Sequence, residues 1–278
     1  MCAGKIAMEL GVGLKRWLTA LITGPLLILA IALGSKFSFF LLVLLVVIIS
    51  LYEFYSMVFK EETRIAKWFG ISVGLLPLIA IYSSNGLQSI LGILVVCTIG
   101  LFTFFLFSNK PTISLINDLG KGILGILYIS VLASHLVLIR GLSFGKEWVF
   151  FVLATIFAGD TGAYYTGRAL GKHKLSPTIS PGKTMEGCIG GLLASVLGAM
   201  VVRSLILPHL KLSHTLILGI AMGIVGQIGD LCESMIKRAA RVKDSGRILP
   251  GHGGMLDRID GLLFAAPLAY YYIWVLLK

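Results

Sequence analysis

The sequence contains few charged residues. Asp, Glu, Lys and Arg make up 13% of its 278 residues, whereas 57% are hydrophobic and the mean hydropathy is +0.94. A soluble domain carries about 25% charge, so this composition excludes a soluble globular protein. One helical crossing of a bilayer takes about 20 apolar residues. The length therefore accommodates about eight to ten membrane helices, in a single integral membrane domain over 1–278.

Cysteine and acidic residues are also scarce. The cysteines form no C-x-x-C pair and have no histidine at metal-ligand spacing, which excludes a disulfide framework and a zinc site; they are Cys2, Cys97, Cys188 and Cys232. The 13 acidic residues stand against 24 basic ones, for a net charge of +11. In a soluble protein this excess would indicate nucleic acid. Here we attribute it to membrane topology and one anionic ligand site, and expect no nucleic-acid partner.

Apolar runs bounded by charged or turn residues predict nine membrane helices. With the N-terminus in the cytoplasm and the C-terminus outside, 18 of the 24 Lys and Arg residues fall on the cytoplasmic side, as the positive-inside rule requires. We therefore expect an all-α polytopic protein of a cell inner membrane, with its polar segments facing the cytoplasm. The expected spans are 17–34, 37–59, 69–84, 87–108, 122–139, 147–167, 187–207, 214–232 and 259–277.

The two halves of the chain differ in polar content. Residues 1–145 contain five acidic residues, mostly in expected loops, and plain Leu, Ile, Val and Phe runs. We interpret this half as a scaffold. Residues 146–278 hold seven acidic residues between 160 and 260, among basic ones, and are expected to form the catalytic helices and loops. The spacings Gly187-x-x-x-Gly191 and Gly219-x-x-x-Gly223 indicate close helix packing, either within the bundle or in a homodimer.

Two carboxylates lie inside expected helices. Asp160 and Asp230 follow the outer ends of their spans by 13 and 16 residues, which places them roughly 20 to 24 Å into a ~30 Å hydrocarbon core. Such groups need partners, a metal ion or a wet cavity. A structural ion pair is the alternative, because Glu233 and Lys237 are one helical turn apart and would pair without any ligand.

The segment from Gly229 to Gly261, GDLCESMIKRAARVKDSGRILPGHGGMLDRIDG, combines both signs of charge. Carboxylates ligate Mg²⁺, cations contact phosphate oxygens, and a glycine turn before a helix offers backbone N–H groups to an anion. Contact with lipid headgroups is the alternative for the basic residues, but it leaves the acidic ones unexplained. The segment therefore predicts a site for a metal and a polyphosphate substrate.

The loop before the seventh expected helix, from His173 to Gly187, adds hydroxyls, a lysine and a glutamate. Its Gly182-Lys183-Thr184 imitates a P-loop, but Pro177 stands where the Walker pattern needs glycine, so a P-loop is excluded. Lys183 remains a candidate phosphate contact. No spacing indicates a nucleophile paired with a base, so covalent catalysis has no support.

Three motifs of the second half stand at fixed spacing. The longest is Ser234-Met-Ile-Lys-Arg, then Lys243-Asp-Ser-Gly246, then Leu249-Pro-Gly-His-Gly-Gly-Met-Leu-Asp-Arg-Ile-Asp260. The others are the loop from Ser176 to Gly187 and the run Gly159-Asp-Thr-Gly-Ala-Tyr-Tyr165. Together they resemble the motifs of the phosphatidate cytidylyltransferases, or CDP-diacylglycerol synthases. The likeness covers the C-terminal half well and the N-terminal half only in hydropathy.

The resemblance implies a reaction in phospholipid biosynthesis. The CMP moiety of CTP would pass to the membrane lipid phosphatidate, with Mg²⁺ required and a K⁺ ion beside it. In the family, the aspartates that match Asp230 and Asp257 are associated with the metal, and we expect Asp260 near them. The cations expected on the triphosphate and the lipid phosphate are Lys237, Arg238, Lys243 and Arg258. Substrate contacts are expected from Asp160, Ser180, Lys183, Glu186, Asp244, His252, Gly253 and Gly254.

Two rival functions are less favoured. Asp257-x-x-Asp260-Gly261 imitates the start of the CDP-alcohol phosphotransferase motif, but Phe264-Ala265 stands where that motif continues with Ala-Arg, and no further acidic residue follows. Intramembrane carboxylates also mark ion paths in transporters and channels. A transporter would be expected to show repeats and broken helices in both halves, which the first half lacks.

Overall fold

The computed structural model describes residues 24–59, 64–84, 88–108, 112–246, 248 and 253–276, and most of them are helical. Helix Gly24–Leu33 comes first, followed by α2 (Lys36–Val58), α3 (Arg64–Gly74), α4 (Leu76–Ser84), α5 (Gln88–Leu106), α6 (Thr112–Gly125), the π-helical segment η2 (Ile126–Val131) and α7 (Leu132–Gly141). The second half contains α8 (Gly145–Leu170), β1 (Lys174–Ser176), β2 (Ser180–Thr184), α9 (Met185–Ile206), α10 (Leu212–Ala239) and α11 (Leu256–Leu276).

Six stretches of helix in the described ranges are long and apolar enough to cross a membrane. They are Lys36–Val58, Arg64–Ser84, Leu115–Gly141, Met185–Ile206, Leu212–Ala239 and Leu256–Leu276. The chain is thus an all-α polytopic membrane protein at this level, apart from one short hairpin that the sequence analysis treated as loop. The three other expected spans overlap helix Gly24–Leu33, α5 and α8. Residues 17–23 and both chain termini lie outside the described residues.

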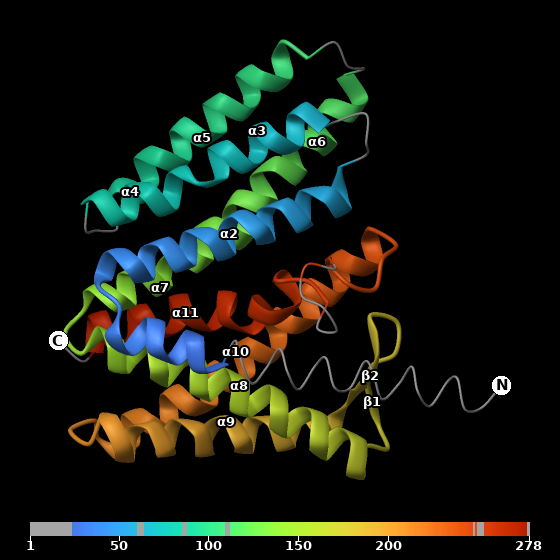
Figure 1. Ribbon diagram of the computed structural model, residues 1–278. Coiled ribbons are helices and arrows are strands. Elements are labelled where there is room, and N and C mark those ends of the chain that lie inside the picture. Colours follow the sequence, from blue (N-terminus) through green and yellow to red (C-terminus); the bar gives the residue numbers. More distant parts are fainter. Residues whose placement is uncertain are drawn as a thin grey trace.

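The helices form layers around a central group (Figure 1). On one side lie α3, α4, α5 and α6, on the other lie α8 and α9, and α2, α7, α10 and α11 run between them. The two halves meet where α11 packs against α7 and α2. The β-hairpin, the end of α10 and the start of α11 lie at the same end of the bundle (Figure 1), so the polar segments of the second half gather there.

One expected span, 69–84, is interrupted for a clear local reason. α3 ends at Gly74 and α4 begins at Leu76, because Pro77 has no N–H to donate to the carbonyl four residues earlier, that of Val73. The thiol of Cys97 lies 3.6 Å from this carbonyl oxygen and donates to it. Cys97 is therefore a buried structural residue.

Glycines allow α8, α9 and α10 to approach closely. A Cβ on Gly191 would lie 2.9 Å from the Cβ of Ala163 and 3.0 Å from the carbonyl oxygen of Gly159 in α8. A Cβ on Gly219 would lie 3.1 Å from the Cα of Val196 in α9. Real Cβ contacts this short are unfavourable, so the glycine spacings serve packing within the bundle, the first of the two predicted alternatives.

Candidate active site

A cavity of about 1130 Å³ lies at the end of the bundle where the polar segments gather. Its walls come from α8, the hairpin, the first turn of α9, α10, the segment after α10 and α11. Five acidic and six basic residues line it: Asp160, Asp230, Asp244, Asp257 and Asp260, with Arg168, Lys183, Lys237, Arg238, Lys243 and Arg258. The cavity can therefore hold a ligand that itself combines cations and anions.

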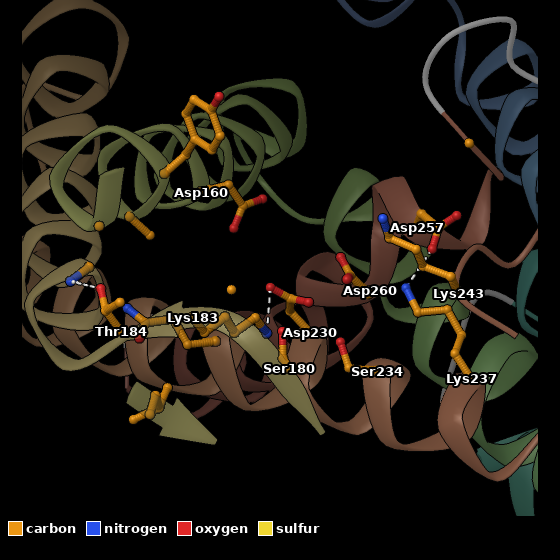
Figure 2. Close-up of a pocket in the computed structure, with 18 of the residues that line it drawn as sticks. Asp160, Ser180, Lys183, Thr184, Asp230, Ser234, Lys237, Lys243, Asp257 and Asp260 are labelled. Atoms are coloured by element: carbon orange, nitrogen blue, oxygen red, sulfur yellow. Dashed lines mark hydrogen bonds and ion pairs between the residues drawn. The ribbon is translucent and has the colours of Figure 1, made fainter. Parts of the chain in front are cut away.

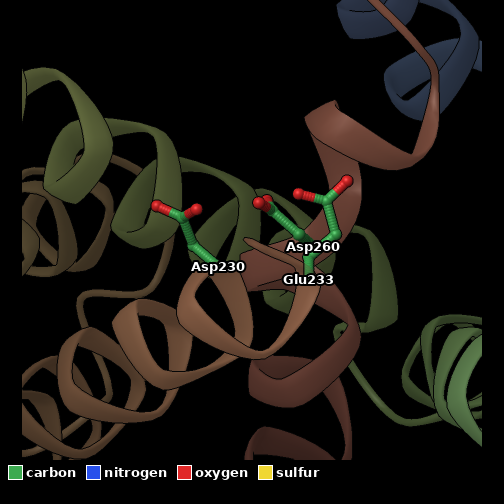
Figure 3. Close-up of side chains that lie close together, drawn as sticks. All are labelled: Asp230, Glu233 and Asp260. Carbon is green, nitrogen blue, oxygen red and sulfur yellow. The ribbon is translucent and has the colours of Figure 1, made fainter. Parts of the chain in front are cut away.

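Three carboxylates come together beside this cavity, and two of them, Asp230 and Asp260, line it. Oxygens of Asp230 and Glu233 on α10 and of Asp260 on α11 all lie within 4.8 Å of one another. Figure 3 shows the carboxylates of Glu233 and Asp260 next to each other, with that of Asp230 on the preceding turn of α10. Glu233 is 1% exposed and Asp260 8%, so mutual repulsion is poorly screened by water. We call these three residues the acid cluster.

The donor set of the acid cluster fits a hard divalent cation. All three residues offer carboxylate oxygens, which Mg²⁺ prefers. Both oxygens of Glu233 are buried; Oε2 forms an ion pair with the ammonium of Lys237, whereas Oε1 has no hydrogen-bond partner in the described part of the chain. A bound cation would be coordinated by these oxygens and would reduce the repulsion between the three carboxylates.

Asp257 is differently engaged. Its Oδ1 accepts a hydrogen bond of 2.6 Å from the ammonium of Lys237. Its Oδ2 accepts from the backbone N–H groups of Ser245 (3.0 Å) and Gly254 (2.9 Å), and from the hydroxyl of Ser245 (3.0 Å). Both oxygens thus already have donors, and Asp257 acts here as a cap that fixes the chain before α11.

Lys237 connects Asp257 to the acid cluster. It is 9% exposed and forms ion pairs with both Glu233 and Asp257. Figure 2 shows Lys237 beside Asp257, at the end of the cavity away from Asp160. A lysine held by two carboxylates has little capacity left for a phosphate oxygen, so its role in this arrangement is to hold those carboxylates in place.

The hairpin brings Lys183 into the site. β1 and β2 pair antiparallel, with Lys174 opposite Thr184, and Thr184 caps α9 by accepting from the N–H of Gly187 (3.1 Å). Lys183 lies one residue before this cap, and its Nζ is 2.7 Å from Oδ2 of Asp230 (Figure 2). Arg238 at the end of α10 donates to the carbonyl of Ile179 at 3.1 Å, which ties the hairpin to the site.

The wall of α8 and α9 supplies further polar groups. Asp160 on α8 faces Asp230 across the cavity (Figure 2). Gln227, one turn before Asp230, donates to the carbonyl of Cys188 at 3.0 Å and accepts from its thiol at 2.5 Å. These two bonds fix α9 against α10 at the cavity lining.

Comparison with known proteins decides the family. The family model described as "Cytidylyltransferase family" matches residues 14–276. The chain belongs to the cytidylyltransferase family. The match extends over the scaffold half as well as over the cavity, so both halves are part of the family's fold.

Curated relatives within this family are bacterial proteins named phosphatidate cytidylyltransferase. That of Staphylococcus epidermidis is 48% identical over 124 residues, 45% of this chain and 48% of the relative. That of Brucella suis is 46% identical over 149 residues, 53% and 55% of the two chains. That of Bacillus subtilis is 41% identical over 159 residues, 56% and 58%. The chain thus spans about half the length of the curated relatives it matches.

Most residues expected at a cytidylyltransferase site lie together. The cavity is lined by Asp160, Ser180, Lys183, Asp230, Lys237, Arg238, Lys243, Asp244, Gly253, Asp257, Arg258 and Asp260. Gly253 has a φ of +83°, a conformation that suits glycine, and it turns the N–H of Gly254 toward Asp257. His252 lies outside the described residues.

Two expected contacts are placed elsewhere. Gly254 is buried beside Ser245 and Glu53 and does not line the cavity in the described ranges. Glu186 accepts from the backbone N–H groups of Lys172 (3.1 Å) and His173 (3.3 Å) and pairs with the His173 ring at 2.6 Å. Its carboxylate therefore closes the base of the hairpin, outside the cavity lining.

Sequence reasoning missed three features of the site. It treated Glu233 only as a partner of Lys237, whereas Glu233 also belongs to the acid cluster. It did not single out Gln227, although Gln227, Asp230 and Glu233 follow one another at three-residue spacing on one face of α10. It counted Glu53 as part of the scaffold, although a carboxylate inside an apolar run is itself a signal of a buried partner.

Proposed function

We propose that this chain transfers the CMP moiety of CTP to phosphatidate, giving CDP-diacylglycerol and pyrophosphate in phospholipid biosynthesis. The observation that carries the proposal is the acid cluster, whose members Asp230 and Asp260 line one cavity together with Lys183, Lys243 and Arg258. A metal–polyphosphate substrate requires this combination of oxygen ligands and cations. The names of the relatives support a lipid phosphate as the second substrate.

The proposed cofactor is Mg²⁺ held by Asp230, Glu233 and Asp260. When bound, it supplies neutralisation and polarisation of phosphate oxygens. The expectation that Asp257 ligates it directly is less well supported, because both oxygens of Asp257 accept hydrogen bonds from the protein. A K⁺ ion beside the Mg²⁺ is part of the same proposal.

In the proposed reaction a phosphatidate phosphate oxygen attacks the α-phosphorus of CTP. A bond forms between that oxygen and the α-phosphorus, and the bond from the α-phosphorus to the oxygen bridging to the β-phosphate breaks, so that pyrophosphate leaves. No general base is required, since the attacking phosphate is already an anion near neutral pH. The task of the protein is to position the two phosphates and to balance their charge.

The cavity cations divide this task. Lys183, set beside Asp230 by the hairpin, and Lys243 and Arg258, which line the same cavity, would contact phosphate oxygens. Arg238 donates to the carbonyls of Ile179 and Val242, and Lys237 is shared by two carboxylates. These last two residues would hold the hairpin and the carboxylates rather than substrate.

The proposal includes a topology. Nine membrane helices, with the N-terminus in the cytoplasm and the C-terminus outside, would place the cavity at the cytoplasmic side of a cell inner membrane. CTP would then enter from water and phosphatidate from the lipid. Labelling of single introduced cysteines in whole cells tests the sidedness, and mass photometry of the purified protein tests whether it forms a homodimer.

The deciding experiment measures pyrophosphate release by the purified protein in detergent. CTP is supplied with or without phosphatidate, Mg²⁺ and K⁺, and CDP-diacylglycerol is identified by mass spectrometry. We expect release that requires CTP, phosphatidate and Mg²⁺ together. A folded protein that releases no pyrophosphate under any of these conditions would overturn the proposal and direct attention to ion flux in liposomes.

A further inference from the structure

A carboxylate of the scaffold half reaches the entrance of the last helix. Glu53 on α2 is 2% exposed. Its Oε1 accepts from the N–H of Met255 at 3.0 Å, and its Oε2 accepts from the N–H of Leu256 at 2.9 Å and lies 3.0 Å from the hydroxyl of Ser245. Glu53 therefore binds a segment about 200 residues later in the chain.

These donors compensate the burial of the Glu53 charge. No lysine or arginine in the described ranges forms an ion pair with Glu53. The first N–H groups of a helix have no intrahelical acceptor and carry partial positive charge, and those before and at the start of α11 point at this carboxylate. The space is closely filled: a Cβ on Gly246 or Gly254 would clash with the Glu53 side chain.

The contact continues into the substrate cavity through Ser245. The hydroxyl of Ser245 lies 3.0 Å from both Glu53 Oε2 and Asp257 Oδ2, and because a hydroxyl has one proton, the two carboxylates share this donor. Asp257 in turn pairs with Lys237, and Lys237 pairs with Glu233 of the acid cluster. An unbroken series of polar contacts thus runs from the scaffold half to the acid cluster.

We propose that Glu53 is a positioning residue for the reaction: by capping α11 and holding Ser245, it sets Asp257, and through Lys237 the acid cluster, at the geometry the phosphates require. The inference rests on the proposed function. Glu53 does not line the cavity, so it acts through these residues and touches no substrate. The scaffold half would then be part of the active-site alignment as well as an anchor in lipid.

The test compares Glu53→Gln and Ser245→Ala with Asp118→Asn. Asp118 is also a buried carboxylate of the first half, but it pairs with Lys121 on its own helix, so its neutralisation controls for a general effect of losing a buried charge. Steady-state kinetics of pyrophosphate release give kcat and KM for each variant. Hydrogen exchange of a peptide covering 253–260 reports on the Met255 and Leu256 amides without any need for activity.

We expect Glu53→Gln to lower kcat by about 10- to 100-fold, the range for removing a hydrogen bond to a charged group, with KM for CTP changed by less than about threefold. Ser245→Ala, which removes only the bridging hydroxyl, is expected to lower kcat by about 10-fold. Amide exchange in 253–260 should accelerate in Glu53→Gln and stay unchanged in Asp118→Asn. In the double variant Glu53→Gln/Ser245→Ala, the fold decrease in kcat should be smaller than the product of the two single decreases, because both changes interrupt the same series of polar contacts.

Several outcomes would overturn the inference. Unchanged kcat and exchange in Glu53→Gln would do so, and so would an equal loss in Asp118→Asn. If Glu53→Gln does not fold, Ser245→Ala decides, and full activity in that variant contradicts the proposal. If the wild type releases no pyrophosphate, the proposed function fails instead, and the exchange of 253–260 still decides whether Glu53 holds the start of α11.

Discussion

Buried carboxylates have different partners in the two halves of this molecule. In the first half Asp118 pairs with Lys121 on the same helix, at 3.2 Å. In the second half Asp230, Glu233 and Asp260 crowd together from two helices, and only Lys183 and Lys237 form ion pairs with them among the described residues. A locally paired charge serves the fold, whereas crowded charges that the fold leaves incompletely paired indicate a ligand.

Glu53 lies between these two cases. It belongs to the first half by sequence and to the second half by its hydrogen bonds. The residues that line the cavity therefore come from the catalytic helices and their loops, whereas a residue of the scaffold half helps to hold them in place. This comparison can be tested at four places, beginning with the largest expected effect.

Neutralising one carboxylate in each half gives the sharpest contrast. Asp260→Asn removes a proposed Mg²⁺ ligand and should lower kcat/KM for pyrophosphate release by about 1000-fold, within the range for losing charge stabilisation at a reacting phosphate. Asp118→Asn, at nearly the same burial (7% against 8% exposed), should retain most activity. Initial rates at saturating Mg²⁺ measure both. Comparable losses would mean that crowding of the acid cluster has no special role.

Within the second half, Glu233→Gln and Asp257→Asn separate metal binding from support. Glu233→Gln removes a proposed Mg²⁺ ligand and should raise the Mg²⁺ concentration for half-maximal rate by at least about 10-fold, since even the partners of metal ligands are typically worth 10- to 100-fold. Asp257→Asn should lower kcat by about 10- to 100-fold with a smaller change in the Mg²⁺ requirement. Mg²⁺ titrations of the rate measure this. The opposite pattern would make Asp257 the ligand and Glu233 the support.

An ion-paired lysine in each half provides the third test. Lys183→Gln should raise KM for CTP by about 10-fold, as expected for one lost charge-assisted contact with a phosphate. Lys121→Gln, which removes an ion-pair partner of Asp118, should leave KM unchanged, and Lys174→Gln controls for a neutralised lysine elsewhere on the hairpin. KM is measured at fixed phosphatidate. If Lys174→Gln shifts KM as much as Lys183→Gln does, Lys183 acts only through the general attraction of CTP to positive charge and not through a specific contact.

Replacing a glycine by alanine is expected to have the smallest effect, and the free energy of unfolding should change with opposite signs in the two halves. Gly191→Ala on α9 places a methyl group 2.9 Å from the Ala163 Cβ and should destabilise the protein by about 1–3 kcal/mol through overpacking. Gly100→Ala on α5 meets nothing within 4 Å and should stabilise it by about 0.5–1 kcal/mol, because alanine favours helix. Thermal unfolding in detergent measures both. A stabilising Gly191→Ala would contradict the close α8–α9 packing.

Much of the fold was predictable because hydropathy reports directly on the bilayer. In lipid, the backbone N–H and C=O groups of a membrane-spanning segment must form hydrogen bonds with one another, so a long apolar run forms a helix regardless of the segments beside it. Each predicted span overlaps a described helix. The break at Leu75, caused by Pro77, and the hairpin after α8 were not predicted. Each depends on a few local groups, whereas the average hydropathy of the surrounding segment indicated one uninterrupted helix in the first case and a loop in the second.

The sequence by itself determined which residue types were available: two aspartates within predicted membrane helices, a basic segment and a glycine turn, gathered in the second half. Helical periodicity also showed that Asp230, Glu233 and Lys237 share a face. Only the tertiary structure decided that Asp260 completes the acid cluster, that Asp257 is held by Lys237 and Ser245, and that Glu53 caps α11. The reason is physical: spacing along one helix defines a face, but which faces meet depends on packing between helices far apart in the chain.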